Sequence, residues 1–291
     1  MPHLCYLIGY IIFEKDKMGI MSELPKLPEA KFVKNGDYTS AYFVLGDEGA
    51  EPLVLCHGLA ASGLQFVNDA HFFAKKGFRV IVPDLRGLGR SITPSDRKVS
   101  DFSISNLASD LIAILDKEKI KTTNWVGNSL GGILALSIIG SNKNRLKSLI
   151  SFGTAYSLNV PRASIPILQF SSDAVGKEIS AQLGARATSP DKDAQLVIYA
   201  MLRDVDMWVV IAIATYVRNY DFIPNALSFE KPMLMIRGSR DFPVNQALKP
   251  TLDAMKNKEN FTLIDVKKAG HCANLDQPEK VQEIILEFLT S

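Results

Sequence analysis

The sequence predicts an α/β protein with a mostly parallel central sheet flanked by helices and a helical segment inserted after the sixth strand. Short apolar runs alternate with helical patterns over most of the 291 residues, which is typical of βαβ units. The runs are continuous, as expected of strands that are buried on both faces. Between residues 155 and 227 the strand pattern stops and helical stretches replace it. We therefore expect one sheet interrupted by a helical insert.

The predicted elements before the insert follow one another in a regular order. A stretch rich in aromatic and β-branched residues predicts a hairpin over residues 31–43, and the apolar run of residues 52–56 ends at a His-Gly pair. The next elements are a helix (68–77), a strand (78–82), a helix (105–118), a strand (123–126), a helix (133–139) and a strand (146–152). Because helices join these strands, we expect right-handed crossovers and parallel pairing.

The insert and the elements after it complete the predicted organisation. Residues 194–217 are a long apolar stretch within the insert, where no segment reads as a convincing strand. Strand character returns at residues 232–236 and 261–266, a helix is expected over 248–255, and an amphipathic helix over 277–289 ends the chain. The sequence therefore divides into an extension (1–21), a core (22–155 and 228–291) and the insert (156–227).

Charge and composition argue against several classes of protein. The 33 basic and 31 acidic residues are interspersed and leave a net charge of +2, so no basic stripe indicates a nucleic-acid partner. Hydrophobic residues make up 47% and charged residues 22% of the chain, which is an ordinary balance for a soluble domain. We expect a cytoplasmic protein that is a monomer or a homodimer.

The extension carries an apolar run of its own over residues 4–13. This run is too short for a membrane-spanning helix, which needs about 20 residues. It also lacks the positive leader and cleavage site of a secretory signal. We favour an upstream extension without function, and the alternative is an apolar arm that packs on a partner subunit or a membrane surface.

Cysteine and histidine usage predicts a protein without metal or cofactor. Three cysteines lie far apart in the sequence, which fits a reducing compartment better than a disulfide framework. The four histidines form none of the common zinc-binding patterns. A minor alternative is a zinc site in which Cys56 and His57 meet His271 and Cys272 in the fold.

The strongest chemical motif is the Gly-Asn-Ser-Leu-Gly-Gly sequence of residues 127–132, between a predicted strand and a predicted helix. A sharp strand-to-helix turn lifts the side chain of Ser129 clear of the sheet, and its strained backbone requires small neighbours. The first N–H groups of the helix, including that of Leu130, are then free to bind a developing oxyanion. The motif predicts Ser129 as a nucleophile; the alternative is a glycine-rich turn without chemistry.

A nucleophilic serine needs a base, and the motif predicts the chain order serine, acid, histidine. Asp241 follows the strand at residues 232–236, and His271 follows the strand at residues 261–266. Because parallel strands end at the same edge of a sheet, these residues should meet near Ser129. We therefore expect His271 to act as the base and Asp241 to orient it.

Two other acids compete with Asp241 for this role. Asp84 lies in the turn after the strand at residues 78–82, and Asp276 reads as the N-cap of the last helix. Asp84 follows an earlier strand, and Asp276 is explained by its capping position, so both rank below Asp241.

The predicted site has further contributors outside the triad. The loop after residues 52–56 offers the backbone N–H of Leu59 as a second oxyanion donor beside that of Leu130. His57 is expected to hydrogen-bond behind the site, and it is also a candidate for contact with the substrate. Met207 and Trp208 in the insert are candidates for contact with an apolar substrate, although ordinary helix packing explains such residues equally well.

Four motifs together carry a family resemblance from about Phe32 to the end of the chain. They are His57-Gly58, the sequence Pro-Asp-Leu-Arg-Gly-Leu-Gly-Arg-Ser at residues 83–91, the Gly-Asn-Ser-Leu-Gly-Gly turn at residues 127–132, and Gly270-His271. In this combination the sequence resembles the α/β-hydrolase superfamily, and within it the carboxylesterases, lactonases and meta-cleavage C–C hydrolases. The resemblance implies an α/β-hydrolase fold in which residues 156–227 form a cap over the active site.

Departures from the family patterns narrow the expected function. A serine nucleophile argues against haloalkane dehalogenases and epoxide hydrolases, which the family pattern associates with aspartate. C–C hydrolases usually carry Gly-Pro-Gly after the first His-Gly, where this chain has Leu59-Ala-Ala-Ser-Gly, and Leu88 replaces the usual histidine of the next turn. We expect hydrolysis of a small-molecule ester or lactone with an apolar acyl part. The alternatives are C–C bond hydrolysis and a ligand-binding protein with little turnover.

Overall fold

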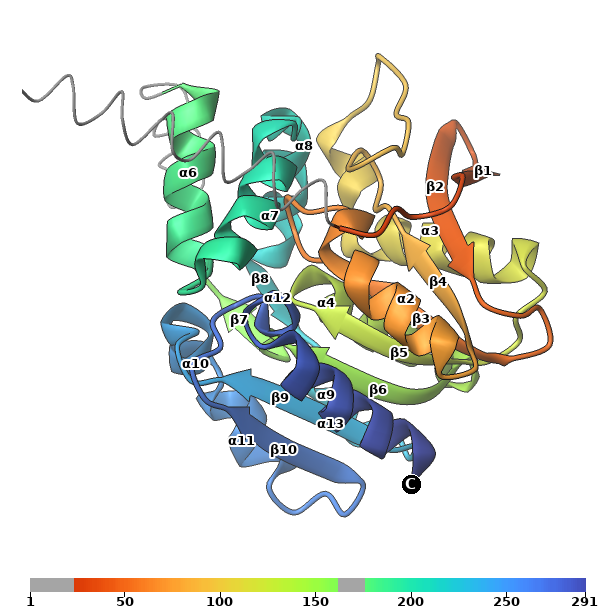
Figure 1. Cartoon of the computed structure of the whole chain (residues 1–291), viewed down its shortest axis with the longest axis vertical. Helices are drawn as coiled ribbons and strands as arrows, with labels where there is room; N and C mark the ends of the chain where they lie inside the picture. Colours follow the sequence, from red (N-terminus) through yellow and green to blue (C-terminus); the bar gives the residue numbers. More distant parts are fainter. Residues whose placement is uncertain (1–23, 162–175) are drawn as a thin grey trace, which may run out of the picture.

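The computed structural model describes residues 24–161 and 176–291. The predicted extension (1–21) lies outside the described residues, as does part of the insert. The chain is built around an eight-stranded sheet with the strand order β1-β2-β4-β3-β5-β6-β9-β10 (Figure 1). Its strands are β1 (Lys31–Asn35), β2 (Tyr38–Leu45), β3 (Glu51–Cys56), β4 (Phe78–Pro83), β5 (Thr123–Asn128), β6 (Leu146–Phe152), β9 (Met233–Gly238) and β10 (Phe261–Val266).

The strand pairing is mostly parallel. Strand β2 runs antiparallel to both β1 and β4, whereas every pairing from β4 through β3, β5, β6 and β9 to β10 is parallel. The carboxyl ends of these six strands therefore lie at one edge of the sheet. The predicted α/β class with a mostly parallel sheet is confirmed.

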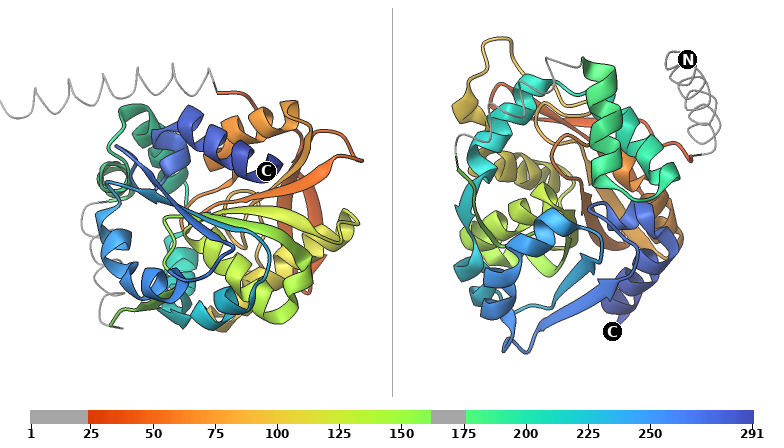
Figure 2. Two further views of the ribbon diagram at one scale, coloured as in Figure 1. Left: turned by 90° about the horizontal axis from the view of Figure 1, so that it is seen from below. Right: turned by 90° about the vertical axis from the view of Figure 1, so that its left-hand side faces the viewer.

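Helices cover both faces of the sheet. Helices α2 (Val67–Lys75) and α13 (Pro278–Thr290) lie on one face, and α3 (Ile104–Lys117) and α4 (Leu130–Asn142) lie on the other (Figure 2). Successive residues of β3 alternate between the two hydrophobic layers, with Leu53 in the layer of α2 and Val54 in the layer of α3. Because both faces are buried, the strands are apolar at consecutive positions, which is the pattern that the sequence shows.

The insert contains two short strands that the sequence pattern did not indicate. Strands β7 (Ser157–Asn159) and β8 (Asn219–Asp221) pair antiparallel at the base of the insert. The expectation of a strand-free insert is therefore wrong. Three residues are too few for a periodic apolar signal, and here the pairing depends on partners that lie about 60 residues apart in the chain.

The helical part of the insert comprises α6 (Lys177–Thr188), α7 (Lys192–Arg203) and α8 (Met207–Val217). Figure 1 shows these three helices grouped near the end of the sheet at which α12 (Ala273–Asp276) lies. The long apolar stretch of residues 194–217 is divided because the Asp206 carboxylate accepts a hydrogen bond from Trp208 N and begins a new helix there. None of the helices in the described ranges is long and apolar enough to cross a membrane.

Candidate active site

Ser129 lies in a strained turn between β5 and α4. It has φ of 49° and ψ of −112°, a conformation that costs a residue with a side chain about 1–3 kcal/mol. The backbone N–H of Ser129 donates to Phe152 O at 2.9 Å, which ties the turn to the end of β6. Residues 123–128 are buried, whereas Ser129 is half-exposed. The turn thus raises the Ser129 side chain out of the sheet edge.

Two glycines of the motif allow this turn to pack closely. A Cβ at Gly131 would overlap the carbonyl group of Cys56 at the end of β3, and one at Gly127 would lie 2.5 Å from the Gly131 carbonyl carbon. Both obstacles are backbone atoms, so neither can move aside easily. These positions require glycine, for the steric reason that the sequence motif implied.

His271 and Asp241 are in direct contact. His271 Nδ1 lies 2.9 Å from Asp241 Oδ2. Asp241 follows β9 and is buried, whereas the His271 side chain is 28% exposed. Because a carboxylate only accepts hydrogen bonds, Nδ1 is the protonated nitrogen and Nε2 carries a free lone pair. This is the tautomer that a general base for a hydroxyl group requires.

The histidine is tied to the serine turn through the backbone. Asn128 Nδ2 donates to His271 O at 2.9 Å, and a Cβ at Gly153 would meet the His271 ring at 3.0 Å. Within the described residues no hydrogen bond joins the Ser129 hydroxyl to the His271 ring, a contact that is often long before substrate binds. The structure therefore brings Asp241 and His271 into contact and holds the Ser129 turn beside them.

The two predicted oxyanion donors lie on segments that border Ser129. A Cβ at Gly58, which precedes Leu59, would lie 3.4 Å from Ser129 Cβ, and Leu130 is the first residue of α4. Among the hydrogen bonds of the described chain, none uses the backbone N–H of Leu59 or Leu130 as donor. Both N–H groups are therefore free to bind an oxygen of a bound molecule.

His57 is fully buried and both ring nitrogens bind backbone groups. Its Nδ1 contacts Gly58 O at 2.8 Å, and its Nε2 accepts from Leu85 N at 3.0 Å. Burial lowers the pKa of His57, which favours the neutral ring. Both ring nitrogens are thus used in a link between two loops, which agrees with the structural role expected for His57. No ring nitrogen remains for a substrate, so the alternative candidacy of His57 for substrate contact is corrected.

The carboxylate of the competing acid Asp84 is hydrogen-bonded to backbone groups outside the His271 loop. It is buried, and its carboxylate accepts from Gly63 N at 2.7 Å and from Arg90 N at 2.8 Å. The side chain therefore joins the loops that follow β3 and β4. Both carboxylate oxygens are bound to backbone N–H groups, which makes Asp84 a loop anchor.

The second competing acid, Asp276, is not the N-cap that the sequence indicated. Gln277 occupies the N-cap position of α13 and makes no side-chain capping bond. Asp276 instead points toward the loop of His271, where one carboxylate oxygen accepts from Gly270 N and the other binds the Ser189 hydroxyl of the insert. The local pattern resembled a cap because Pro278 opens the helix, but the side-chain partner of Asp276, Ser189, lies 87 positions away in the sequence.

The two candidate substrate contacts in the insert lie at the start of α8. The Trp208 side chain is 39% exposed and packs edge-to-face on Phe102 with a centroid distance of 5.5 Å. Arg97 covers the same indole ring at 4.8 Å. Met207 is half-buried. The described contacts of Trp208 are thus packing contacts, and none of them reaches Ser129.

The structure also contains a buried amide network that the sequence did not reveal. The Gln65 side chain accepts from Gly58 N at 3.3 Å and donates to Asn128 Oδ1 at 3.0 Å. It donates as well to Asn274 Oδ1 at 3.3 Å, on the helix that follows His271. The network therefore connects the loop of Leu59, the turn of Ser129 and the loop of His271. Isolated polar residues in apolar segments were its only signal in the sequence.

The network ends at a buried carboxylate. Asp69 accepts from Asn274 Nδ2 at 2.7 Å and from Gln282 Nε2 at 2.9 Å, and none of its partners carries a charge. Burial is the main cause that raises the pKa of Asp69 to about 6. The folded protein therefore binds a proton at this site at a pH where the unfolded chain has released it.

This buried acid predicts a pH-dependent difference in stability between the wild type and Asp69→Asn. Protonation of Asp69 stabilises the fold below its ordinary pKa of 3.8, and this contribution is lost as the pH rises through about 6. Relative to Asp69→Asn, the wild type should lose about 1–2 kcal/mol of unfolding free energy between pH 5 and pH 8, since one pKa unit corresponds to about 1.4 kcal/mol. Urea titrations at the two pH values measure the difference, and a constant difference would contradict the prediction.

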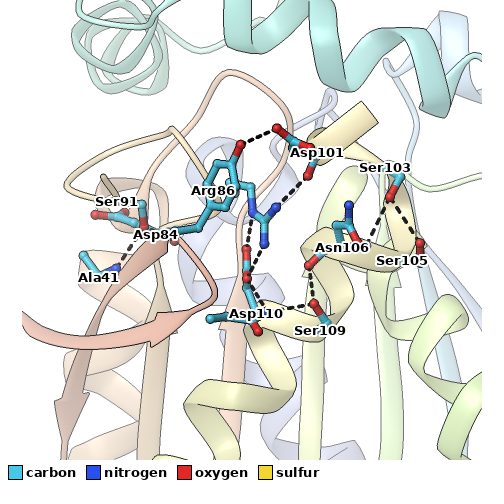
Figure 3. A network of polar contacts seen from close by, with 12 residues as sticks. Ala41, Asp84, Arg86, Ser91, Asp101, Ser103, Ser105, Asn106, Ser109 and Asp110 are labelled. Atoms are coloured by element: carbon cyan, nitrogen blue, oxygen red, sulfur yellow. Dashed lines mark hydrogen bonds and ion pairs between the residues drawn. The ribbon is translucent and has the colours of Figure 1, made fainter. Parts of the chain in front are cut away.

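The loop after β4 is held by an ion pair that is almost completely buried. Arg86 donates to both carboxylate oxygens of Asp110, at 2.7 and 2.6 Å, and its third contact is Asp101 O at 2.7 Å (Figure 3). Its guanidinium group stacks on the Tyr38 ring at 3.8 Å. All three guanidinium nitrogens therefore donate hydrogen bonds and one face of the group is covered by the ring, so the loop is fixed to α3.

The residues that the zinc alternative required do not form a metal site in the structure. Across residues 24–161 and 176–291, no group of three or more histidine, cysteine and acidic side chains is arranged to hold an ion. Cys56 and Cys272 are buried thiols, and burial raises the pKa of each.

Comparison with known proteins assigns this fold to a class. A family model described as the alpha/beta hydrolase fold matches residues 51–189. The enol-lactonase of Burkholderia xenovorans LB400 superposes with a TM-score of 0.77 over 90% of this chain and 100% of that chain, at 21% sequence identity. Together with the strand order, these matches show an α/β-hydrolase fold, as the sequence motifs predicted. The family to which the chain is similar is the α/β-hydrolase superfamily.

Curated relatives extend the likeness along the chain. A dihydrolipoyllysine-residue acetyltransferase component of the acetoin cleaving system of Pseudomonas putida is 27% identical over 85% of this chain and 66% of its own length. A 2-hydroxy-6-oxononadienedioate/2-hydroxy-6-oxononatrienedioate hydrolase of Paraburkholderia xenovorans (strain LB400) is 27% identical over 92% of this chain and 98% of its own length. Matches to two epoxide hydrolases span only 33% and 21% of those proteins. The chain therefore spans two thirds or less of the acetyltransferase component and of the two epoxide hydrolases, and nearly the whole length of the Paraburkholderia xenovorans hydrolase.

Proposed function

We propose that the protein is a serine hydrolase that cleaves a carboxylic ester or a lactone through an acyl-enzyme. The observation that carries this proposal is the 2.9 Å contact between His271 Nδ1 and Asp241 Oδ2 beside the strained turn of Ser129. It leaves Nε2 as the proton acceptor on the side of the ring away from the carboxylate. A strained serine turn and an oriented histidine together are the parts that acyl transfer needs.

The proposed reaction proceeds in two halves. Ser129 Oγ attacks the substrate carbonyl while its proton passes to His271 Nε2, and the oxyanion binds the free N–H groups of Leu59 and Leu130. The tetrahedral intermediate then collapses, and His271 returns the proton to the leaving alcohol. Water repeats the sequence on the acyl-enzyme, releasing the acid and restoring Ser129. Asp241 stabilises the imidazolium that forms in each half.

C–C bond hydrolysis is the second candidate. The relative from Paraburkholderia xenovorans, whose name describes a 2-hydroxy-6-oxononadienedioate/2-hydroxy-6-oxononatrienedioate hydrolase, matches 98% of its own length, which favours this candidate. The sequence Leu59-Ala-Ala-Ser-Gly, in place of Gly-Pro-Gly, counts against it. We place it second for this reason.

The decisive experiment measures hydrolysis of p-nitrophenyl esters of increasing acyl length, of acyl lactones and of a vinylogous 1,5-diketone by wild type and Ser129→Ala. We expect wild type to hydrolyse esters or lactones and Ser129→Ala to show no turnover above the blank. The matched control is Ser228→Ala, since this exposed hydroxyl donates to Asn225 O and has no other hydrogen bond within residues 24–161 and 176–291. It should retain full activity.

Three outcomes would overturn the proposal in different ways. Cleavage of the diketone without ester hydrolysis assigns the protein to C–C hydrolysis. Turnover that survives in Ser129→Ala assigns the nucleophile elsewhere. Absence of labelling by a fluorophosphonate probe, together with absence of turnover, leaves a ligand-binding protein on this fold.

A further inference from the structure

The corner between α6 and α7, residues 188–191, contacts the loop that carries His271. We call these residues the insert corner, and residues 267–276 the histidine loop. The backbone N–H of His271 donates to Thr188 O at 3.1 Å. A Cβ at Gly270 would lie 2.9 Å from both Thr188 O and Pro190 Cδ, so the two segments are in close contact there. The insert thus touches the backbone of the proposed base directly.

A buried side-chain pair joins the same two segments. The Ser189 hydroxyl binds one carboxylate oxygen of Asp276, whose other oxygen accepts from the Gly270 N–H. Ser189 is 2% exposed and Asp276 is 4% exposed. A buried acceptor that loses its donor stays desolvated without compensation. The pair is therefore a specific link that neither segment can replace with water at low cost.

The insert corner itself is held firmly. Ser189 Oγ accepts from Asp191 N at 3.0 Å, and Ser189 O accepts from Gln195 Nε2 at 2.9 Å. Asp191 is in turn the N-cap of α7. The hydroxyl that meets Asp276 is consequently fixed relative to α7.

The backbone of His271 is held from two sides. Its N–H binds the insert corner through Thr188 O, and its carbonyl binds the core through Asn128 Nδ2. Among the described residues, Asp241 alone hydrogen-bonds the ring, at Nδ1. A displacement of the insert corner therefore moves the His271 backbone against a ring that is anchored in the core.

We propose that Ser189 and Asp276 are positioning residues, through which the insert sets the distance between His271 and Ser129. This inference rests on the proposed function, because it assumes that His271 is the base. Neither residue touches the reacting atoms; each acts through the backbone of Gly270 and His271. The insert then affects catalysis by positioning His271 through residues 188–191, in addition to any contact that it makes with substrate.

Kinetics on ester substrates provide the first test. We expect Ser189→Ala and Asp276→Ala each to lower kcat by roughly ten- to a hundredfold with little change in KM, since a small misplacement of a catalytic group has effects of this size. Asp276→Asn keeps an acceptor for the Gly270 N–H and should recover part of kcat. Because the two residues act as a unit, the double alanine variant should be no slower than the slower single variant.

The matched control is Asp191→Asn. It removes a charge from the same corner, yet asparagine retains the N-cap of α7 and the substitution leaves Ser189 and Asp276 in place. We expect its kcat to equal that of wild type. Equal losses in Asp191→Asn and Ser189→Ala would overturn the proposal, because they would reflect a general disturbance of the corner.

Hydrogen exchange provides a readout that does not depend on turnover. The amides of Gly270 and His271 should exchange at least about tenfold faster in Ser189→Ala than in wild type or Asp191→Asn, since the link restrains both. Unchanged exchange together with unchanged kcat in Ser189→Ala would overturn the inference. Faster exchange in a protein that hydrolyses no substrate would refute the proposed function and leave the link itself supported. If Asp276→Ala does not fold, Ser189→Ala and Asp276→Asn decide the question.

Discussion

Asp241→Asn is expected to lower kcat for ester hydrolysis by about 10⁴-fold without unfolding the protein. The carboxylate accepts a hydrogen bond from His271 Nδ1 at 2.9 Å. An amide in its place can present its NH₂ group to Nδ1, which moves the ring proton to Nε2. The histidine then faces Ser129 with a donor and cannot remove the serine proton.

The measurement compares kcat and the rate of fluorophosphonate labelling in wild type and Asp241→Asn. Both rates should fall, and the urea midpoint should stay close to that of wild type because asparagine fills the same volume. Asp84→Asn serves as the comparison variant, because Asp84 is the competing acid. Both of its carboxylate oxygens bind backbone N–H groups, those of Gly63 and Arg90. Near-normal turnover in Asp241→Asn would contradict the assignment and point to another acid.

Asp110→Ala is expected to destabilise the fold by about 3–5 kcal/mol, the usual cost of leaving one partner of a buried ion pair alone. Arg86 and Asp110 side chains are 5% and 4% exposed, so neither charge is compensated by water. Asp110 also accepts from Asn35 Nδ2 at 2.8 Å, and this hydrogen bond would be lost as well. Urea unfolding of wild type and variant measures the loss.

Helix α3 supplies a control with the same chemistry at its surface. Asp116 pairs with Arg145, and its side chain is 62% exposed. Its replacement by alanine should cost no more than about 1 kcal/mol. A double variant, Arg86→Met with Asp110→Leu, should recover most of the stability lost in Asp110→Ala. If Asp110→Ala and Asp116→Ala cost the same, the buried pair does not have the role that its geometry indicates.

The parts of the fold that follow local rules were predictable from the sequence. The apolar runs of β3, β5, β6 and β9 report burial on both faces, so their existence and parallel pairing follow from composition and spacing. The division of the insert into α7 and α8 did not follow, because the Asp206 cap lies within an apolar stretch. The strands β7 and β8 were missed because each is three residues long and finds its partner across the insert.

The candidate site likewise has residues that the sequence predicted and residues that it did not. Chain order and the shared edge of parallel strands led to Ser129, Asp241 and His271, and the structure brings the last two into contact. Their catalytic roles remain predictions. The partners of Asp276 were not predictable, since Ser189 lies 87 positions away and reaches it only through the packing of the insert on the core. A local pattern carries no information about such a pair.

The backbone N–H of His271 binds a carbonyl that belongs to the insert, and this has a consequence for engineering. Exchange of inserts between related scaffolds is an obvious route to new selectivity. A grafted segment must reproduce more than a pocket surface here: it must return a carbonyl at position 188 and a hydroxyl at position 189 to the same places. Chimeras that retain residues 188–191 preserve both groups, whereas those that replace this corner without a hydroxyl at position 189 lose the link to Asp276.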